Sequence, residues 1–218
     1  MRAIVSEAIG TCLLAATIAG SGIMGERLSG GNVALAFLAN SIATGAILVT
    51  LIFTFAPVSG AHFNPVVSLA AAFEGAFPWS RVPAYIAAQI TGAIVGVVAV
   101  HAMFAHPLLA LSHHSRAGLA QSFSEFLATF GLLVVILGTG KRAAVVPLTV
   151  AAYITAAYWF TSSTSFANPA VTIARCLTDT FSGIAPADVP AFILAQLLGA
   201  MTASLLFRWL GKADTEKR

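Results

Sequence analysis

The chain has 218 residues, of which 58% are hydrophobic and only 9% are charged. This composition is far more apolar than that of a soluble domain, which excludes an ordinary water-soluble protein. Eleven Lys and Arg against eight acidic residues give a formal net charge of +3, and in a chain this apolar such an excess does not indicate nucleic-acid binding. The sequence therefore predicts a protein of the lipid bilayer.

Six apolar segments are long enough to cross about 30 Å of hydrocarbon as helices. The first lacks a small-residue cleavage site, so we expect a retained span rather than a signal peptide. Two further segments, beginning at Asn64 and Asn168, are each about ten residues long and are predicted to be re-entrant half-helices. The six predicted spans are residues 4–23, 33–56, 82–104, 122–138, 144–161 and 189–210.

Three sequence matches recur in the same order in the two halves of the chain. Each half holds three spans, an odd number, so the second half must be inverted in the membrane relative to the first. We expect one all-α domain of two inverted repeats, residues 1–108 and 118–212, followed by a cytoplasmic tail at 213–218. The matched pairs are Ser6-Glu7 with Ser124-Glu125, Asn64-Pro65-Val66 with Asn168-Pro169-Ala170, and residues 83–93 with 190–200.

The basic residues between the spans predict the orientation, because cytoplasmic loops carry an excess of Lys and Arg. With a cytoplasmic N-terminus, three arginines lie outside: Arg27, Arg116 and Arg175. The even number of spans returns the C-terminus to the cytoplasm. The inner basic residues are then Arg2, Arg81, Lys141, Arg142, Arg208, Lys212, Lys217 and Arg218.

The two Asn-Pro pairs are helix-start signals. Asn is a strong N-cap residue, and Pro suits the first helical position, where its missing N–H is no loss. In inverted repeats the two starts can meet near the midplane, where the positive ends of the helix dipoles oppose cations and protons. The amides of Asn64 and Asn168 can donate hydrogen bonds to a passing neutral solute. A single Asn-Pro is more often an ordinary turn, but two copies in repeat register favour a pore.

These motifs resemble those of the aquaporin and aquaglyceroporin family, known as the major intrinsic proteins. Residues 59–67, with Asn64, Pro65 and Val66, resemble its first signature loop, and Asn168, Pro169 and Ala170 resemble its second. The resemblance covers nearly the whole chain. It implies six spans, two half-helices, one pore per subunit and a homotetramer, with neither a cofactor nor a metal and no enzymatic activity.

The family narrows its pore at four positions, which the resemblance carries over to Thr44, Ala156, Ser165 and Val171 by their distances from the signature asparagines. Water-selective members have an aromatic residue, His and Arg at the first, second and fourth positions. Here these are Thr, Ala and Val, which predicts a wide filter without its fixed positive charge. Arg175 lies one helical turn beyond Val171, so we expect it in the vestibule. The alternative is that Arg175 or another arginine supplies the positive charge that the filter otherwise lacks.

The combination of Val at position 171, directly after Asn168-Pro169-Ala170, with Thr at position 44 resembles that of a bacterial subgroup, the AqpS-type channels of arsenic-resistance operons. The resemblance implies a passive channel of the bacterial inner membrane for small uncharged solutes: glycerol-like polyols, water, and possible passage of arsenite and methylarsenicals. The alternative is a water-selective aquaporin.

Glu7 and Glu125 are acids inside predicted spans, and an intramembrane acid is by default a functional candidate. In the family the matching acids brace the re-entrant loops by accepting backbone hydrogen bonds, and we expect that role here. The alternative is a secondary transporter that carries protons on these two residues. An intramembrane enzyme would require a cluster such as H-E-x-x-H, which the sequence lacks.

Overall fold

The computed structural model describes residues 1–140, 142 and 144–215, with side chains to residue 211. The described part is helical, without strands. Two short helices, α3 and α7, begin directly after Asn64 and Asn168. The helices are α1 (Arg2–Leu28), α2 (Val33–Ser59), α3 (Pro65–Phe73), η1 (Trp79–Arg81), α4 (Val82–Met103), α5 (Leu119–Thr139), α6 (Val146–Phe160), α7 (Pro169–Arg175), η2 (Pro186–Asp188) and α8 (Val189–Thr215).

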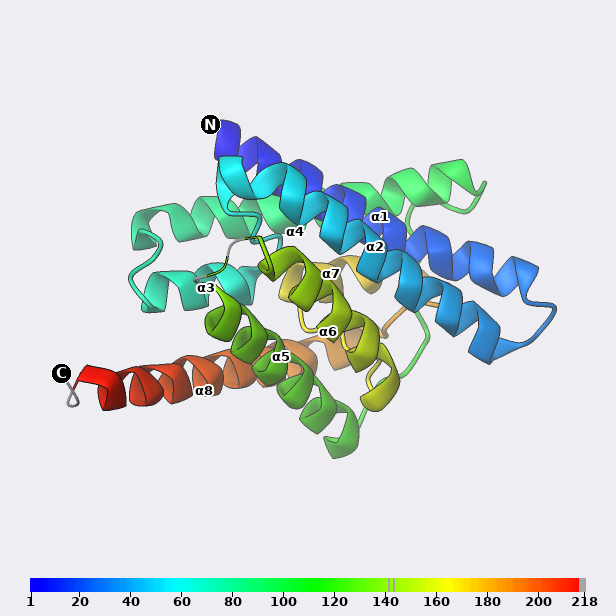
Figure 1. Cartoon of the computed structure of the whole chain (residues 1–218). Helices are drawn as coiled ribbons and strands as arrows, with labels where there is room; N and C mark the ends of the chain where they lie inside the picture. Colours follow the sequence, from blue (N-terminus) through cyan, green and yellow to red (C-terminus); the bar gives the residue numbers. More distant parts are fainter. Residues whose placement is uncertain (141, 143, 216–218) are drawn as a thin grey trace.

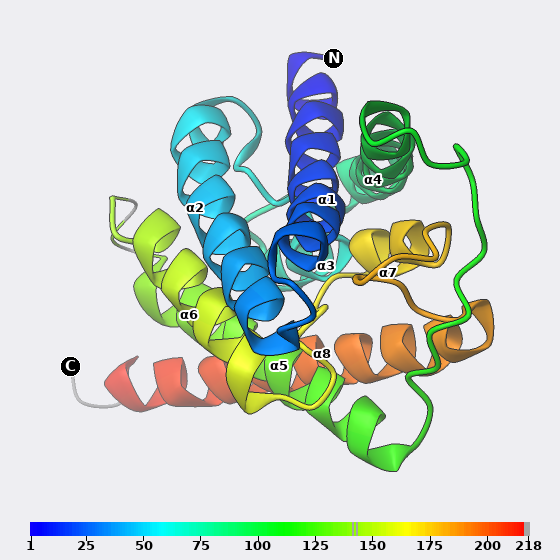
Figure 2. The ribbon, with the colours of Figure 1, turned by 90° about the vertical axis from the view of Figure 1, so that its right-hand side faces the viewer.

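The long helices form two groups of three. Helix α1 packs against α2 and α4, and α5 packs against α6 and α8. The groups meet where α2 packs against α6, and each short helix contacts both α4 and α8. Figure 2 shows α1, α2 and α4 on one side and α5, α6 and α8 on the other, with α3 and α7 between them. The start of α1 and the end of α8 lie on the same side of the molecule (Figure 1).

The structure differs from the predicted spans most clearly at four places. Helix α1 ends at Leu28, five residues beyond the predicted end of the first span. Helix α2 continues through Pro57 and ends at Gly60, whose φ of 89° is a left-handed conformation that glycine adopts without strain. Helix α6 has only 15 residues, about 22 Å, because it begins one residue before Pro147 and gives way to extended chain at Thr161. Helix α8 continues to Thr215, so only residues 216–218 of the predicted tail lie beyond it, outside the described residues.

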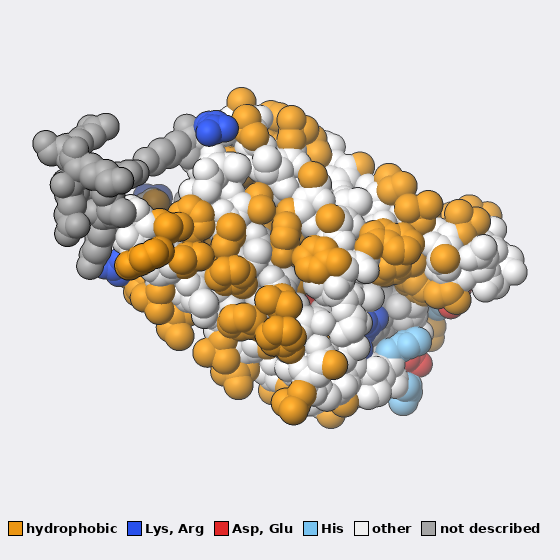
Figure 3. Space-filling model, turned by 60° about the horizontal axis from the view of Figure 1, so that its bottom comes forward, with side chains coloured by type: hydrophobic (Ala, Val, Ile, Leu, Met, Phe, Trp, Pro, Cys, Tyr) orange, Lys and Arg blue, Asp and Glu red, His pale blue; other side chains and the backbone are white. Residues whose placement is uncertain are grey.

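The surface is that of a membrane protein. Five of the described helices are long and apolar enough to cross a bilayer, and α6 is the shorter apolar one. Large hydrophobic side chains such as Ile42, Phe53 and Leu205 are exposed to the surroundings. On the face in Figure 3 hydrophobic side chains spread over the middle, and His and acidic side chains lie near one end. Basic side chains are visible near both ends. The chain is a multi-pass membrane protein.

Small residues allow the paired helices to approach closely. A Cβ at Gly92 or Gly96 of α4 would collide with the backbone carbonyl of Ala8 or Cys12 of α1. A Cβ at Gly199 of α8 would collide with the carbonyl of Phe126 of α5. Close packing of this kind holds helices together in lipid, where the hydrophobic effect does not drive their association.

Candidate functional site

The asparagines of the two Asn-Pro pairs cap the short helices. Oδ1 of Asn64 accepts a hydrogen bond from the backbone N–H of Val66 at 3.1 Å. Oδ1 of Asn168 accepts from the N–H of Ala170 at 3.0 Å and of Val171 at 3.3 Å. The amide oxygens therefore face their own helices, and the NH₂ groups are directed elsewhere.

The two asparagines also tie the loops before α3 and α7 to each other. Nδ2 of Asn64 donates to the carbonyl of Ala167 at 2.7 Å, and Nδ2 of Asn168 donates to the carbonyl of Phe63 at 2.8 Å. Each amide group carries two N–H donors. One donor of each asparagine holds the opposite loop, which leaves the second for a molecule between the two helix starts.

Glu7 and Glu125 lie behind these loops, and neither side chain is exposed. Glu7 accepts from the hydroxyl of Ser59, the backbone N–H groups of His62 and Phe63, and the amide of Gln89, at 2.7–3.0 Å. A carboxylate with this many charge-assisted bonds fixes the backbone that donates them.

The second carboxylate repeats the arrangement in the other half. Glu125 accepts from the N–H groups of Phe166 and Ala167 and from the amide of Gln196, at 2.6–2.9 Å. Both acids are outside the wall of the central cavity.

Two glutamines complete the same network, and the sequence analysis assigned them no role. Nε2 of Gln89 donates to Glu7 and also to Ser68 of α3 at 3.0 Å, and Nε2 of Gln196 donates to Glu125 and to Thr172 of α7 at 2.9 Å. Each glutamine therefore joins a loop to the half-helix that follows it. In the sequence, these two glutamines occupy corresponding positions of the repeated segments 83–93 and 190–200, which was the observation that could have indicated a shared role.

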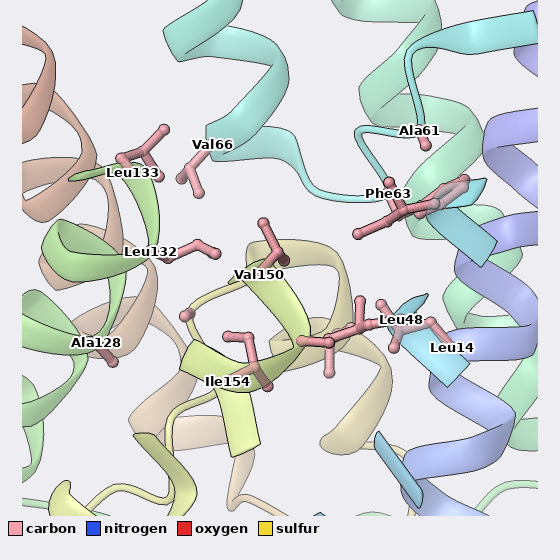
Figure 4. Packing of buried hydrophobic residues seen from close by; sticks show 14 of the residues in the cluster. Leu14, Leu48, Ala61, Phe63, Val66, Ala128, Leu132, Leu133, Val150 and Ile154 are labelled. Carbon is pink, nitrogen blue, oxygen red and sulfur yellow. The ribbon is translucent and has the colours of Figure 1, made fainter. Parts of the chain in front are cut away.

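A cavity of about 500 Å³ runs past both asparagines. Its wall includes Glu74 after the end of α3, Gly140 after the end of α5, and Arg175 at the end of α7. Leu48, Leu132 and Val150 belong to the hydrophobic cluster around it and are seen from close by in Figure 4. The cavity is lined by Leu14, Ile18, Thr44, Leu48, Ile52, Ala56, Gly60, Ala61, His62, Phe63, Asn64, Val67, Ala70, Ala71, Glu74, Ala76, Leu132, Leu133, Ile136, Leu137, Gly140, Val146, Val150, Ile154, Tyr158, Ser165, Phe166, Ala167, Asn168, Val171 and Arg175.

Three of the four expected filter residues, Thr44, Ser165 and Val171, line this cavity, but Ala156 does not. The prediction for Ala156 was wrong, because α6 presents Ile154 and Tyr158 to the cavity, and a residue two positions from each lies on the opposite side of a helix. Ala156 is exposed. Counting back from Asn168 failed because the connection between Phe160 of α6 and Pro169 of α7 is not helical, so the distance along the chain does not define which face of α6 a residue occupies.

Comparison with known proteins identifies the family. The family model described as major intrinsic protein matches residues 1–157 and 141–217, which together span nearly the whole chain. The chain belongs to the major intrinsic protein family. As a member of this family it is a passive membrane channel with the aquaporin fold.

Individual members of the major intrinsic protein family match over most of their length. The chain is 53% identical over 210 residues to Aquaglyceroporin AqpS of Rhizobium meliloti (strain 1021), covering 96% of this chain and 90% of that protein. It is 31% identical over 227 residues to Aquaporin NIP2-1 of Oryza sativa subsp. japonica, covering 100% and 73%. The X-ray structure of the aquaglyceroporin from Plasmodium falciparum shares the fold, with a TM-score of 0.71 and 21% identity over 94% of each chain.

Hydroxyl groups gather at the level of Thr44 in this member of the major intrinsic protein family. The hydroxyl of Tyr158 lies 3.1 Å from Oγ1 of Thr44, which in turn donates to the carbonyl of Asn40 at 2.9 Å. Tyr158 is therefore the donor to Thr44, and its oxygen keeps free lone pairs. The hydroxyl of Ser165 is buried without a hydrogen-bond partner among the described residues.

Arg175 ends α7 and lies at the cavity wall with its side chain largely buried. Its Nε donates to the carbonyl of Ser182, and its Cζ lies 3.4 Å from the centre of the Phe166 ring. The guanidinium is thus held by the loop after α7 and by Phe166, one helical turn away from Val171. Among the described residues no group of three or more His, Cys, Asp or Glu is placed to hold a metal.

Proposed function

We propose that the channel passes small uncharged polyhydroxyl solutes, such as glycerol, together with water, and that arsenite and methylarsenicals are candidate substrates. The observation that carries the proposal is the set of side chains that share the cavity wall with Val171. Thr44, Tyr158 and Ser165 supply hydroxyls, and Val171 supplies an apolar wall where water-selective relatives place an arginine. A solute with several hydroxyl groups can exchange its hydration water for these partners.

Two features of the chemistry favour a polyol over water alone. Tyr158 has unused lone pairs and Ser165 has an unused hydroxyl, so a solute can both donate and accept at this level. Ile154 and Val171 face the same cavity and suit the carbon side of a polyol. Arsenite is the trihydroxide at neutral pH, and it offers hydroxyls in the same way. The relative named an aquaglyceroporin, at 53% identity, supports this choice.

We infer that the residues around the pore have the roles that the family resemblance implies. Asn64 and Asn168 act as the signature residues, and Glu7 and Glu125 brace the loops. The filter is formed by Thr44, Ser165 and Val171, with Tyr158 in place of Ala156. We further infer two inverted repeats, a homotetramer, and a bacterial inner membrane location with both termini in the cytoplasm. A bacterial relative and the distribution of Lys and Arg support the location.

The test is stopped-flow light scattering on proteoliposomes under glycerol, arsenite and water gradients. Val171→Arg adds a long cation beside the hydroxyls, and Val171→Met adds a comparable length without the charge. The proposal expects wild-type flux of glycerol and arsenite, a strong fall in Val171→Arg and a smaller fall in Val171→Met. A wild type that passes only water, with Val171→Arg unchanged, would show a water-selective channel.

A further inference from the structure

Glu74 is the one acidic side chain among the described residues that line the cavity. It follows α3 as its C-cap residue, one position beyond Phe73. Its Oε1 is buried and has no hydrogen-bond partner, and none of the ion pairs between described residues involves it. A carboxylate therefore lies in the wall of the cavity that also includes Gly140, without an ion pair to any described residue and beside the path of the solute.

Glu74 differs from the two buried acids, Glu7 and Glu125. Glu7 accepts four hydrogen bonds and Glu125 accepts three, so both have a structural use for their charge. Glu74 also sits at a helix C-terminus, where the helix dipole disfavours a negative charge. Neither a hydrogen bond through Oε1 nor the dipole explains an acid at this position.

Two parts of the cavity wall attract anions. The amides of Asn64 and Asn168 present N–H donors near the two helix starts, and Arg175 is the one basic Lys or Arg side chain in the described lining. A pore wide enough for a polyol is wide enough for a small monovalent anion, and no side chain at the level of Val171 repels one. A channel for neutral solutes therefore needs a barrier to anions somewhere else.

We propose that Glu74 is that barrier: a specificity-determining residue whose carboxylate, together with the negative C-terminal end of α3, keeps small anions out of the pore. The inference deepens the proposed function, because it rests on a pore wide enough for polyols. Arg208 lies nearby with its Cζ 4.9 Å from the centre of the Phe73 ring, but it makes no ion pair with Glu74. The carboxylate thus stays available to the pore. Neutral solutes pass it, and its unused oxygen can accept their hydroxyl hydrogen.

The experiment measures chloride and glycerol flux in the same proteoliposomes. Chloride flux is driven by a potassium gradient with valinomycin and read with an encapsulated chloride-sensitive dye; glycerol flux is read by light scattering. The variants are Glu74→Gln and Glu74→Ala, which remove the charge, and Glu74→Asp, which keeps it. Glu26→Gln is the matched control, because Glu26 is exposed, lies outside the cavity wall and changes the net charge equally.

Removal of a charge beside the path is expected to raise chloride flux about three- to tenfold in Glu74→Gln and Glu74→Ala, with glycerol flux kept within about twofold. Glu74→Asp and Glu26→Gln should stay at the wild-type level. The proposal is overturned if neither charge-removing variant exceeds the wild type in chloride flux, or if Glu74→Asp rises as far as Glu74→Gln. A wild type that fails to pass glycerol contradicts the proposed solute, whereas the chloride comparison still decides the role of Glu74.

Discussion

The hydroxyl of Tyr158 on α6 lies 3.1 Å from Oγ1 of Thr44 on α2, which joins the two halves of the molecule at the cavity wall. Because Thr44 donates to Asn40, Tyr158 donates to Thr44 and offers its lone pairs to a solute. We predict that Tyr158→Phe lowers glycerol flux about fivefold, since one hydrogen bond of about 1 kcal/mol is lost, and leaves water flux nearly unchanged. Swelling assays in proteoliposomes measure both.

The control for that variant is Tyr153→Phe on the same helix. Tyr153 donates to the carbonyls of Leu127 and Ala128 and does not line the cavity. The glycerol flux of Tyr153→Phe should therefore equal that of the wild type. Equal losses in Tyr153→Phe and Tyr158→Phe would mean that helix packing, rather than the hydroxyl in the pore, controls the flux.

The hydrogen bonds from the loop before α7 to Glu125 predict that this acid contributes to the free energy of unfolding. Glu125→Gln places an NH₂ group or a weaker acceptor opposite the N–H donors of Phe166 and Ala167, so at least one buried donor loses a good partner. We expect a loss of about 1–3 kcal/mol in the free energy of unfolding. Denaturation in detergent with a fluorescence readout measures it, and Glu26→Gln, at an exposed acid, should unfold like the wild type.

The same acids decide between a channel and a proton-coupled transporter. Glu7 and Glu125 are fully buried and lie outside the cavity wall, so their protons have no route along the solute path. We predict that glycerol flux into proteoliposomes is the same with and without a pH difference across the membrane. Solute accumulation driven by an imposed pH gradient, and lost in Glu7→Gln or Glu125→Gln, would be the behaviour of a transporter.

The contact between α1 and α4 predicts a steric effect at Gly96. A methyl group there would collide with the carbonyl of Cys12, which neither backbone can easily avoid. We expect Gly96→Ala to destabilise the protein by about 1–3 kcal/mol, seen as a lower midpoint of thermal aggregation in detergent. Gly20→Ala is the matched control at the same helix pair, because its Cβ would meet Val100 at an ordinary 3.5 Å. A shift of equal size in both variants would contradict the explanation by close approach.

The loops on the side of Arg175 carry a pair that responds to acid. The backbone N–H of His113 donates to Asp179 at 2.9 Å and its Nδ1 lies 3.0 Å from the same carboxylate, and these hydrogen bonds hold the pKa of Asp179 below its ordinary 3.8. A lowered pKa in the folded state stabilises the paired loops above pH 3.8, and this stabilisation is lost as the pH falls through the folded value. The protection of residues 110–116 against hydrogen exchange, relative to the intrinsic exchange rate at each pH, should therefore fall below pH 3.8.

Two variants separate the contributions to that pair. His113→Ala removes the side-chain partner and should move the pKa of Asp179 upward, as measured by NMR titration of the carboxyl carbon. His114→Ala should move it less, because Nε2 of His114 lies 4.0 Å from Asp179 and makes no hydrogen bond to it. An unchanged pKa in His113→Ala would leave the backbone donor as the sole cause.

The sequence by itself determined the family, the number of helices and the two half-helices. A helix start at Asn-Pro depends on local chemistry, a span depends on the length of an apolar run, and both can be read along the chain. It also indicated Thr44, Ser165 and Val171, because Thr44 lies on the helix that leads to the loop of Asn64 and the other two lie three residues from Asn168.

Tertiary structure decided what depends on how distant segments meet. Ala156 was misplaced because the connection between α6 and α7 is not helical, so a distance counted from Asn168 does not define the rotation of α6; a shift of two residues turns a helix by about 200°. Only the packing of α6 against α2 shows that Tyr158 faces the cavity. Gln89 and Gln196 gained their roles because each reaches both an acid and a half-helix from another segment. Glu74 likewise became notable only in three dimensions, since the lack of a partner for its Oε1 among the described residues is a property of its surroundings and not of its position in the chain.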